Sequence, residues 1–155
     1  MKEEELYQPP SADLTPDATS AEALYSPGQV AVATFLGSPL AGCWLMASNF
    51  RELDQLDARQ KTLFGGVAVS IVVLLLALFL PEDFPSIVLP LAYSIGLRQL
   101  AVQMQGEAFD AHREAGGLRH SHWRVAGVSV VAFIAFIVMT VAAVFLIPES
   151  LLPLE

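Results

Sequence analysis

The sequence predicts an all-α integral membrane protein, a bundle of four transmembrane helices. Two stretches carry this prediction, residues 62–80 and 125–147, and neither contains a charged residue. About 20 residues at a rise of 1.5 Å cross a hydrocarbon core of roughly 30 Å, so each stretch is long enough to span a bilayer. The composition agrees, because 54% of the residues are hydrophobic and only 15% are charged, whereas about a quarter of a soluble domain is charged.

The first segment, residues 1–25, is predicted to be a disordered acidic tail. It is polar, contains prolines and shows no hydrophobic periodicity, and Lys2 is its one basic residue. It does not resemble a signal peptide, because its start is acidic and no apolar core follows within these residues. The net charge of −8 also argues against a nucleic-acid partner.

The first two predicted spans are residues 27–50 and 62–80. Ser26-Pro27 suits the start of a helix, and Pro39 predicts a kink in the first span. Small residues four positions apart allow two helix backbones to approach closely. The candidate packing residues of this kind are Gly37, Ser38, Ala41, Gly42, Gly66 and Ser70.

The third and fourth predicted spans are residues 86–105 and 124–147. Residues 81–85 form a tight Pro-containing turn, so the second and third spans should be an antiparallel hairpin. The third span is only a dozen uncharged residues long before Arg98, and its helix should run on into water until Gly116-Gly117. Residues 149–155 form a short C-terminal tail.

The distribution of Lys and Arg predicts the orientation. The basic loops, 51–61 and 106–124, should be cytoplasmic, and both termini should then be external in an inner-membrane, multi-pass protein. The turn at 81–85 and the C-terminal tail contain no Lys or Arg.

Arg98, Gln99 and Gln103 form the most polar cluster near membrane depth. A charge at that depth is a functional candidate, here for contact with a ligand or lipid. No Asp or Glu lies within a span to pair with it, so the simpler interpretation is an arginine that extends to lipid phosphates.

Two further patterns each allow a reactive and a structural interpretation. His112, His120 and His122 could ligate a metal, but we expect solvated loop histidines and no metal. Residues 40–43 match a lipobox ending at Cys43, but the acidic start favours packing inside a helix. No catalytic constellation or nucleotide motif is present, so we expect neither an enzyme nor a cofactor.

Several short patches resemble one uncharacterised family of small bacterial membrane proteins with about four transmembrane helices. The tail opens with a YxPPxAxL-like pattern, Tyr7 to Leu14, and the remaining patches cover roughly residues 25–147. These patches are Ala33–Ala41, Asn49–Arg51, Gln105-Gly106, His112, Gly116-Gly117, Ser121 and Trp123-Arg124. The resemblance implies a shared topology and carries over no activity.

The expected function is therefore structural or interactive, as a subunit or accessory partner in a membrane complex. The partners would be membrane lipids and further copies of this chain or other membrane proteins. The alternative is a small oligomeric transporter or channel in which Arg98, Gln99 and Gln103 line the path.

Overall fold

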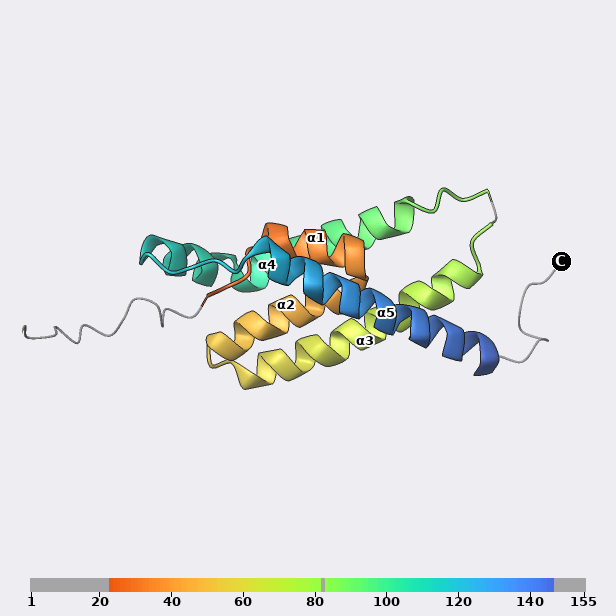
Figure 1. Cartoon of the computed structure of the whole chain (residues 1–155), viewed down its shortest axis with the longest axis horizontal. Helices are drawn as coiled ribbons and strands as arrows, with labels where there is room; N and C mark the ends of the chain where they lie inside the picture. Colours follow the sequence, from red (N-terminus) through yellow and green to blue (C-terminus); the bar gives the residue numbers. More distant parts are fainter. Residues whose placement is uncertain (1–22, 82, 147–155) are drawn as a thin grey trace, which may run out of the picture.

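The computed structural model describes residues 23–81 and 83–146. Within them the chain is all-helical, which confirms the predicted class, and an isolated bridge joins Leu24 to Arg119. The helices are α1 (Pro27–Gly37), α2 (Pro39–Glu52), α3 (Leu56–Leu78), α4 (Val88–Glu114) and α5 (His122–Leu146) (Figure 1). Most of the predicted acidic tail and all of residues 149–155 lie outside the described part of the chain.

The prediction of one kinked helix over residues 27–50 is wrong, because the chain reverses direction at Ser38. Ser38 has φ 86° and ψ 170°, in the left-handed half of conformational space. Pro39 contributes to the break, since it lacks a backbone N–H and disfavours helical geometry at the residue before it. Two short antiparallel helices result, and we call α1 and α2 together the hairpin.

The hairpin begins with a complete capping box. The backbone N–H of Gln29 donates to Ser26 Oγ over 3.2 Å, and the backbone N–H of Ser26 donates to Gln29 Oε1 over 3.0 Å. Pro27 occupies the first turn. These bonds satisfy two N–H groups that a helix start leaves without partners.

The hairpin lies in the middle of the molecule, and the three long helices pack around it. The α3 helix packs on α2, α4 packs mainly on α1, and α5 crosses both (Figure 1). The predicted antiparallel pair, α3 and α4, therefore share the hairpin as a neighbour and do not contact each other to a comparable extent. Most of the buried apolar side chains belong to the hairpin.

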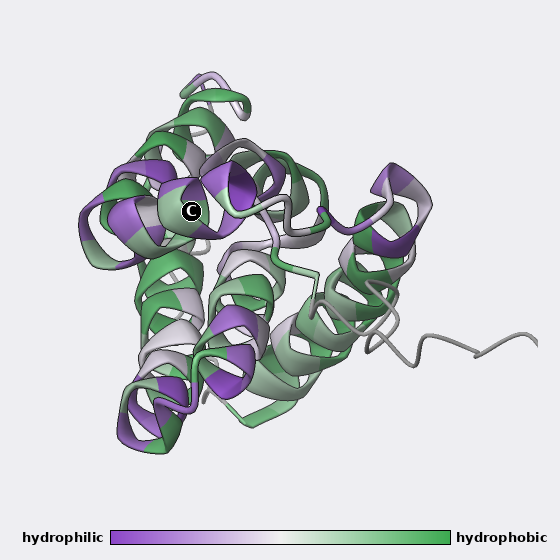
Figure 2. Ribbon diagram, turned by 90° about the vertical axis from the view of Figure 1, so that its left-hand side faces the viewer, coloured by the Kyte–Doolittle hydropathy of each residue, from purple (hydrophilic) through white to green (hydrophobic). Residues whose placement is uncertain are grey.

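The long helices are apolar on the outside. The α3 and α5 helices are long and apolar enough to cross a membrane, over Leu56–Ala77 and His122–Leu146. Only 17% and 11% of the residues in the most apolar windows of these two helices are buried. The α4 helix, which contains Arg98 and a polar second half, is not one of these candidate spans. Hydropathy colouring shows apolar ribbon along the helices and hydrophilic segments at their ends (Figure 2).

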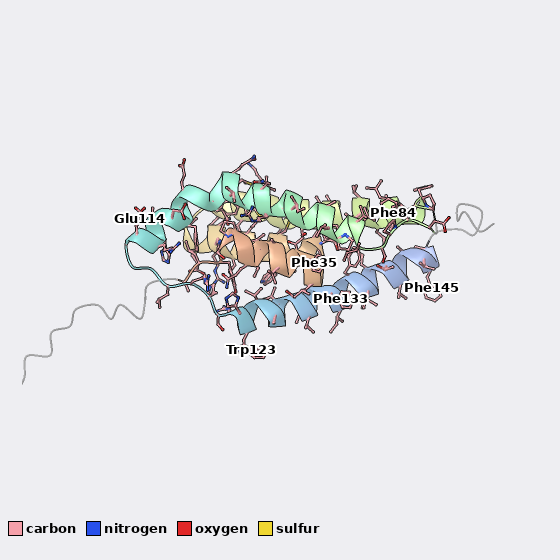
Figure 3. The ribbon with its side chains drawn as sticks, turned by 90° about the horizontal axis from the view of Figure 1, so that it is seen from above. Phe35, Phe84, Glu114, Trp123, Phe133 and Phe145 are labelled. Atoms are coloured by element: carbon pink, nitrogen blue, oxygen red, sulfur yellow. The ribbon has the colours of Figure 1, made fainter. Side chains whose placement is uncertain are left out.

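The two ends of the bundle differ. Leu24, the α2–α3 connection and loop 115–121 meet at one end, which we call the base, whereas the α3–α4 connection and the C-terminal end of α5 lie at the far end (Figure 1). Figure 3 shows Glu114 and Trp123 toward the base, with Phe84 and Phe145 at the far end. The start of α1 and the loop 106–124 were expected on opposite sides of a membrane. They lie at the same end because α2 runs back beside α1 to the base. The start of α1 and the end of α2 are therefore on one side of the molecule.

Candidate functional site

A buried amide pair closes the open end of the hairpin. Asn49, near the end of α2, is 2% exposed. Its Oδ1 accepts from the backbone N–H of Tyr25 and its Nδ2 donates to the carbonyl oxygen of Tyr25, both over 2.8 Å. Asn49 thus pairs with the strand-like segment before α1 as another backbone would.

Gln105 connects Asn49 to α4. Its Oε1 accepts from Asn49 Nδ2 over 3.0 Å, and its Nε2 donates to the carbonyl oxygen of Met46 over 2.8 Å. Gln105 is 3% exposed. We call Tyr25, Asn49 and Gln105 the latch, because their bonds join α1, α2 and α4 at the base.

Loop 115–121 is held against the latch. Gln29 Nε2 donates to the carbonyl oxygen of His120 over 2.7 Å, and Leu24 exchanges backbone hydrogen bonds with Leu118 and His120. The rings of Tyr25 and His120 lie 4.1 Å apart. Burial, followed by the positive charge of Arg124, lowers the pKa of His120, and the charge of Glu52 opposes this shift.

The three histidines singled out in the sequence have separate environments. His112 Nε2 lies 3.2 Å from the carbonyl oxygen of Leu118, and His122 Nε2 lies 3.2 Å from the guanidinium of Arg119. His120 stacks on Tyr25. No group of three His, Cys, Asp or Glu side chains within the described residues is arranged to hold a metal ion.

Arg98, Gln99 and Gln103 are exposed. The buried stripe of α4, which faces the hairpin, consists instead of Ser94, Leu97, Ala101 and Gln105. The sequence therefore singled out the outer face of α4 and missed Gln105 on its inner face. The spacing of that stripe, three and then four residues, is a signal that could have identified Gln105.

The predicted packing residues lie where helices approach most closely. A Cβ added to Gly37 would come 2.5 Å from the carbonyl oxygen of Ser129 on α5, and one on Gly66 would come 2.6 Å from the Cβ of Cys43. Gly42 faces Thr34 and Leu97, and Ala41 lies beside Gly37. Ser70 is buried and donates to the carbonyl oxygen of Gly66. Ser38 is also buried, and its Oγ has no hydrogen-bond partner within the described part of the chain.

A groove of about 650 Å³ lies between α3 and α5, with α2 as its floor. Cys43 lies in this floor, so the lone thiol belongs to a packed helix face. The walls are apolar, and Arg124 lies at the base end. The larger wall residues are Leu40, Trp44, Leu63, Val67, Val128 and Val131.

Comparison of the chain with models of protein families, with curated proteins and with solved structures finds no match. Function therefore has to be inferred from the chain's own geometry. The site that this geometry offers is the base of the bundle, with its satisfied latch, its cations and the adjoining apolar groove.

Proposed function

We propose that this chain is a multi-pass bacterial inner-membrane protein with a structural or interaction role, a subunit or accessory partner of a membrane complex without catalysis of its own. One observation carries the proposal. The buried side-chain amides of Gln29, Asn49 and Gln105 are occupied by hydrogen bonds within the protein, while large apolar side chains cover the outside of the long helices. A soluble domain rarely exposes so much contiguous apolar surface, which is typical of lipid or protein contact.

The proposed topology follows from the fold. The three long helices cross the bilayer, and the hairpin enters and leaves on the same side. An interrupted helix at membrane depth is acceptable where protein covers the break, and Ser38 is buried. Segments 51–61 and 106–124, which contain most of the Lys and Arg residues, lie at or near the base, so the base is cytoplasmic and the far end is external.

The alternative of a small transporter or channel is less well supported. Arg98, Gln99 and Gln103 face away from the hairpin. A path lined by them would need a second copy to enclose it, whereas outward-facing arginine and glutamine suit lipid headgroups.

Cysteine labelling tests the topology. Cys43 is the one cysteine, so Cys43→Ala gives a background for Gly28→Cys, Gln55→Cys and Asp83→Cys. In spheroplasts, a membrane-impermeant maleimide should label position 83 at once and positions 28 and 55 only after permeabilisation. Labelling of position 28 in intact spheroplasts would instead support a first span that crosses the bilayer.

Purification in mild detergent tests the interaction role. A tagged chain expressed at its native level should retain a membrane protein in constant ratio. The matched control is Asn49→Leu with the same tag, because a chain with an opened latch keeps its apolar surface and reports non-specific capture. Recovery of the wild-type chain alone would contradict the role as a subunit.

A further inference from the structure

The groove between α3 and α5 has the length of one lipid leaflet. It extends along α5 from Arg124 to Ala135, about 16 Å at 1.5 Å per residue. Half of a hydrocarbon core of roughly 30 Å is the same length. The groove therefore reaches from the base to the middle of the proposed membrane, as an extended acyl chain does.

Small residues keep the groove open. Gly66 and Gly127 lie on facing walls, from α3 and α5. A Cβ added to Gly127 would meet no atom within 4 Å, so the space beside this residue is empty in the structure. An apolar space of this size lies within the range of about 300–1,000 Å³ that is typical of ligand pockets.

The base end of the groove is positively charged. Arg124 lines it directly. A small polar pocket shares Trp44 and Leu63 with the groove and adds Ser48 and Arg59, so a second cation lies at the same end. Arg51 also lines that pocket, where it forms an ion pair with Glu52.

The occupant must therefore combine a long apolar chain with an anionic head. A guanidinium binds phosphate oxygens through two parallel hydrogen bonds, which is stronger than a contact between neutral groups. An indole such as that of Trp44 suits the boundary between headgroups and chains. A second copy of this chain would offer no phosphate to these arginines.

We propose that the groove holds one acyl chain of an anionic glycerophospholipid whose phosphate is bound by Arg124 and Arg59. The inference rests on the membrane location proposed above and adds a specific lipid site to it. The lipid belongs to the cytoplasmic leaflet, where anionic lipids attract basic segments.

Trp44 provides the readout. The chain has two tryptophans, so Trp123→Phe leaves Trp44 as the sole tryptophan, at the groove, and excitation at its red edge avoids the tyrosines. Purified protein in detergent is titrated with phosphatidylglycerol brominated on its acyl chains, and bromine quenches the indole on contact. Phosphatidylcholine with the same brominated chains is the control for the headgroup. We expect phosphatidylglycerol to quench at a concentration about tenfold lower, because phosphatidylcholine offers the same phosphate together with a choline cation that the two arginines repel.

Three variants separate the contribution of the lipid headgroup from that of the acyl chain. Arg124→Gln should remove the preference for phosphatidylglycerol and keep weak quenching by both lipids. Gly127→Leu should reduce quenching by both lipids, since the leucine fills the open space. Arg113→Gln removes one cation from an exposed position on α4 outside the groove and should behave as wild type.

Equal quenching by the two lipids in the wild-type background would overturn the proposal and indicate bulk lipid only. An effect of Arg113→Gln as large as that of Arg124→Gln would also overturn it. So would a detergent-resistant dimer whose Trp44 is not quenched, because a second copy would then fill the groove. If the cysteine labelling shows the proposed topology while the lipid preference is absent, the groove alone is rejected and the membrane role stands.

Discussion

The hairpin and the long helices differ in which side chains they bury and which they expose. The α1 and α2 helices are short, interrupted and mostly buried, and their polar side chains bond to backbone groups far away in the chain. The α3 and α5 helices are long and continuous, and they expose most of their large apolar residues. The difference teaches that hydropathy identifies long helices with an apolar exterior, while a helix pair enclosed by protein is specified by its hydrogen bonds.

The largest expected effect comes from breaking the latch with Asn49→Leu. This change leaves the Tyr25 backbone and the Gln105 amide buried without their partner, at a cost of about 3 kcal/mol or more. Thermal unfolding of the purified protein in detergent should show a lower midpoint.

A second test of the latch uses Gln105, and its matched control is Gln103, an exposed amide on the same helix, α4. Gln105→Ala should destabilise the protein substantially, since it removes two buried bonds, whereas Gln103→Ala on the exposed face should have little effect. Equal midpoints for Asn49→Leu and wild type would refute the view that hydrogen bonds specify the hairpin.

A smaller effect is expected where the hairpin meets α3. Gly66→Leu brings side-chain atoms against Cys43 on α2, and overpacking of this kind costs about 1–3 kcal/mol. The neighbouring Gly65 is the matched control, because a Cβ there meets nothing within 4 Å. Gly65→Leu should be neutral or slightly stabilising, since leucine favours a helix more than glycine does.

Unfolding midpoints in detergent also test this contrast. If both leucine variants unfold at the same temperature, the close approach of α2 and α3 at Gly66 does not contribute to stability. A partial recovery of Gly66→Leu by the added change Cys43→Ala would locate the clash at the thiol side chain.

The sequence alone predicted the long helices well and the hairpin poorly. The uncharged runs and the Pro81–Pro85 segment indicate α3 and α5 with the connection after α3, because a candidate membrane span is recognised by length and apolarity alone. The reversal at Ser38 depends on the bonds of Asn49 to Tyr25 and to Gln105. These two partners lie 24 and 56 residues from Asn49 in the sequence. Local propensity at Gly37-Ser38-Pro39 signals a break and does not specify its angle.

The sequence singled out the exposed face of α4 and not Gln105 on its buried face for a related reason. Arg98 attracted attention as a charge near membrane depth, but the position of a side chain on a helix relative to the core is decided by the whole buried stripe. The groove was missed entirely. Gly66 was chosen for close packing, and nothing local to it indicates that Gly127 on α5 faces it across an open space.

The smallest expected effect is a dependence on pH at the base. The pKa of His120 is lowered by burial and by Arg124, so the folded state disfavours the charged imidazole. Above the ordinary value of about 6.5, histidine is neutral in both states and contributes no pH dependence. As the pH falls below that value, the unfolded chain takes up a proton before the folded one does, so stability decreases.

Unfolding midpoints in detergent measured from pH 7.5 to 5 should therefore decline, and His120→Gln, which cannot titrate, should flatten part of that decline. Protonation of His120 also opposes its packing on Tyr25 beside Arg124, so the loss should appear first as loosening of loop 115–121. An unchanged slope in His120→Gln would show that the ring is solvated in the folded protein and that the loop is held by hydrogen bonds to its backbone, from Leu24 and Gln29, without the imidazole.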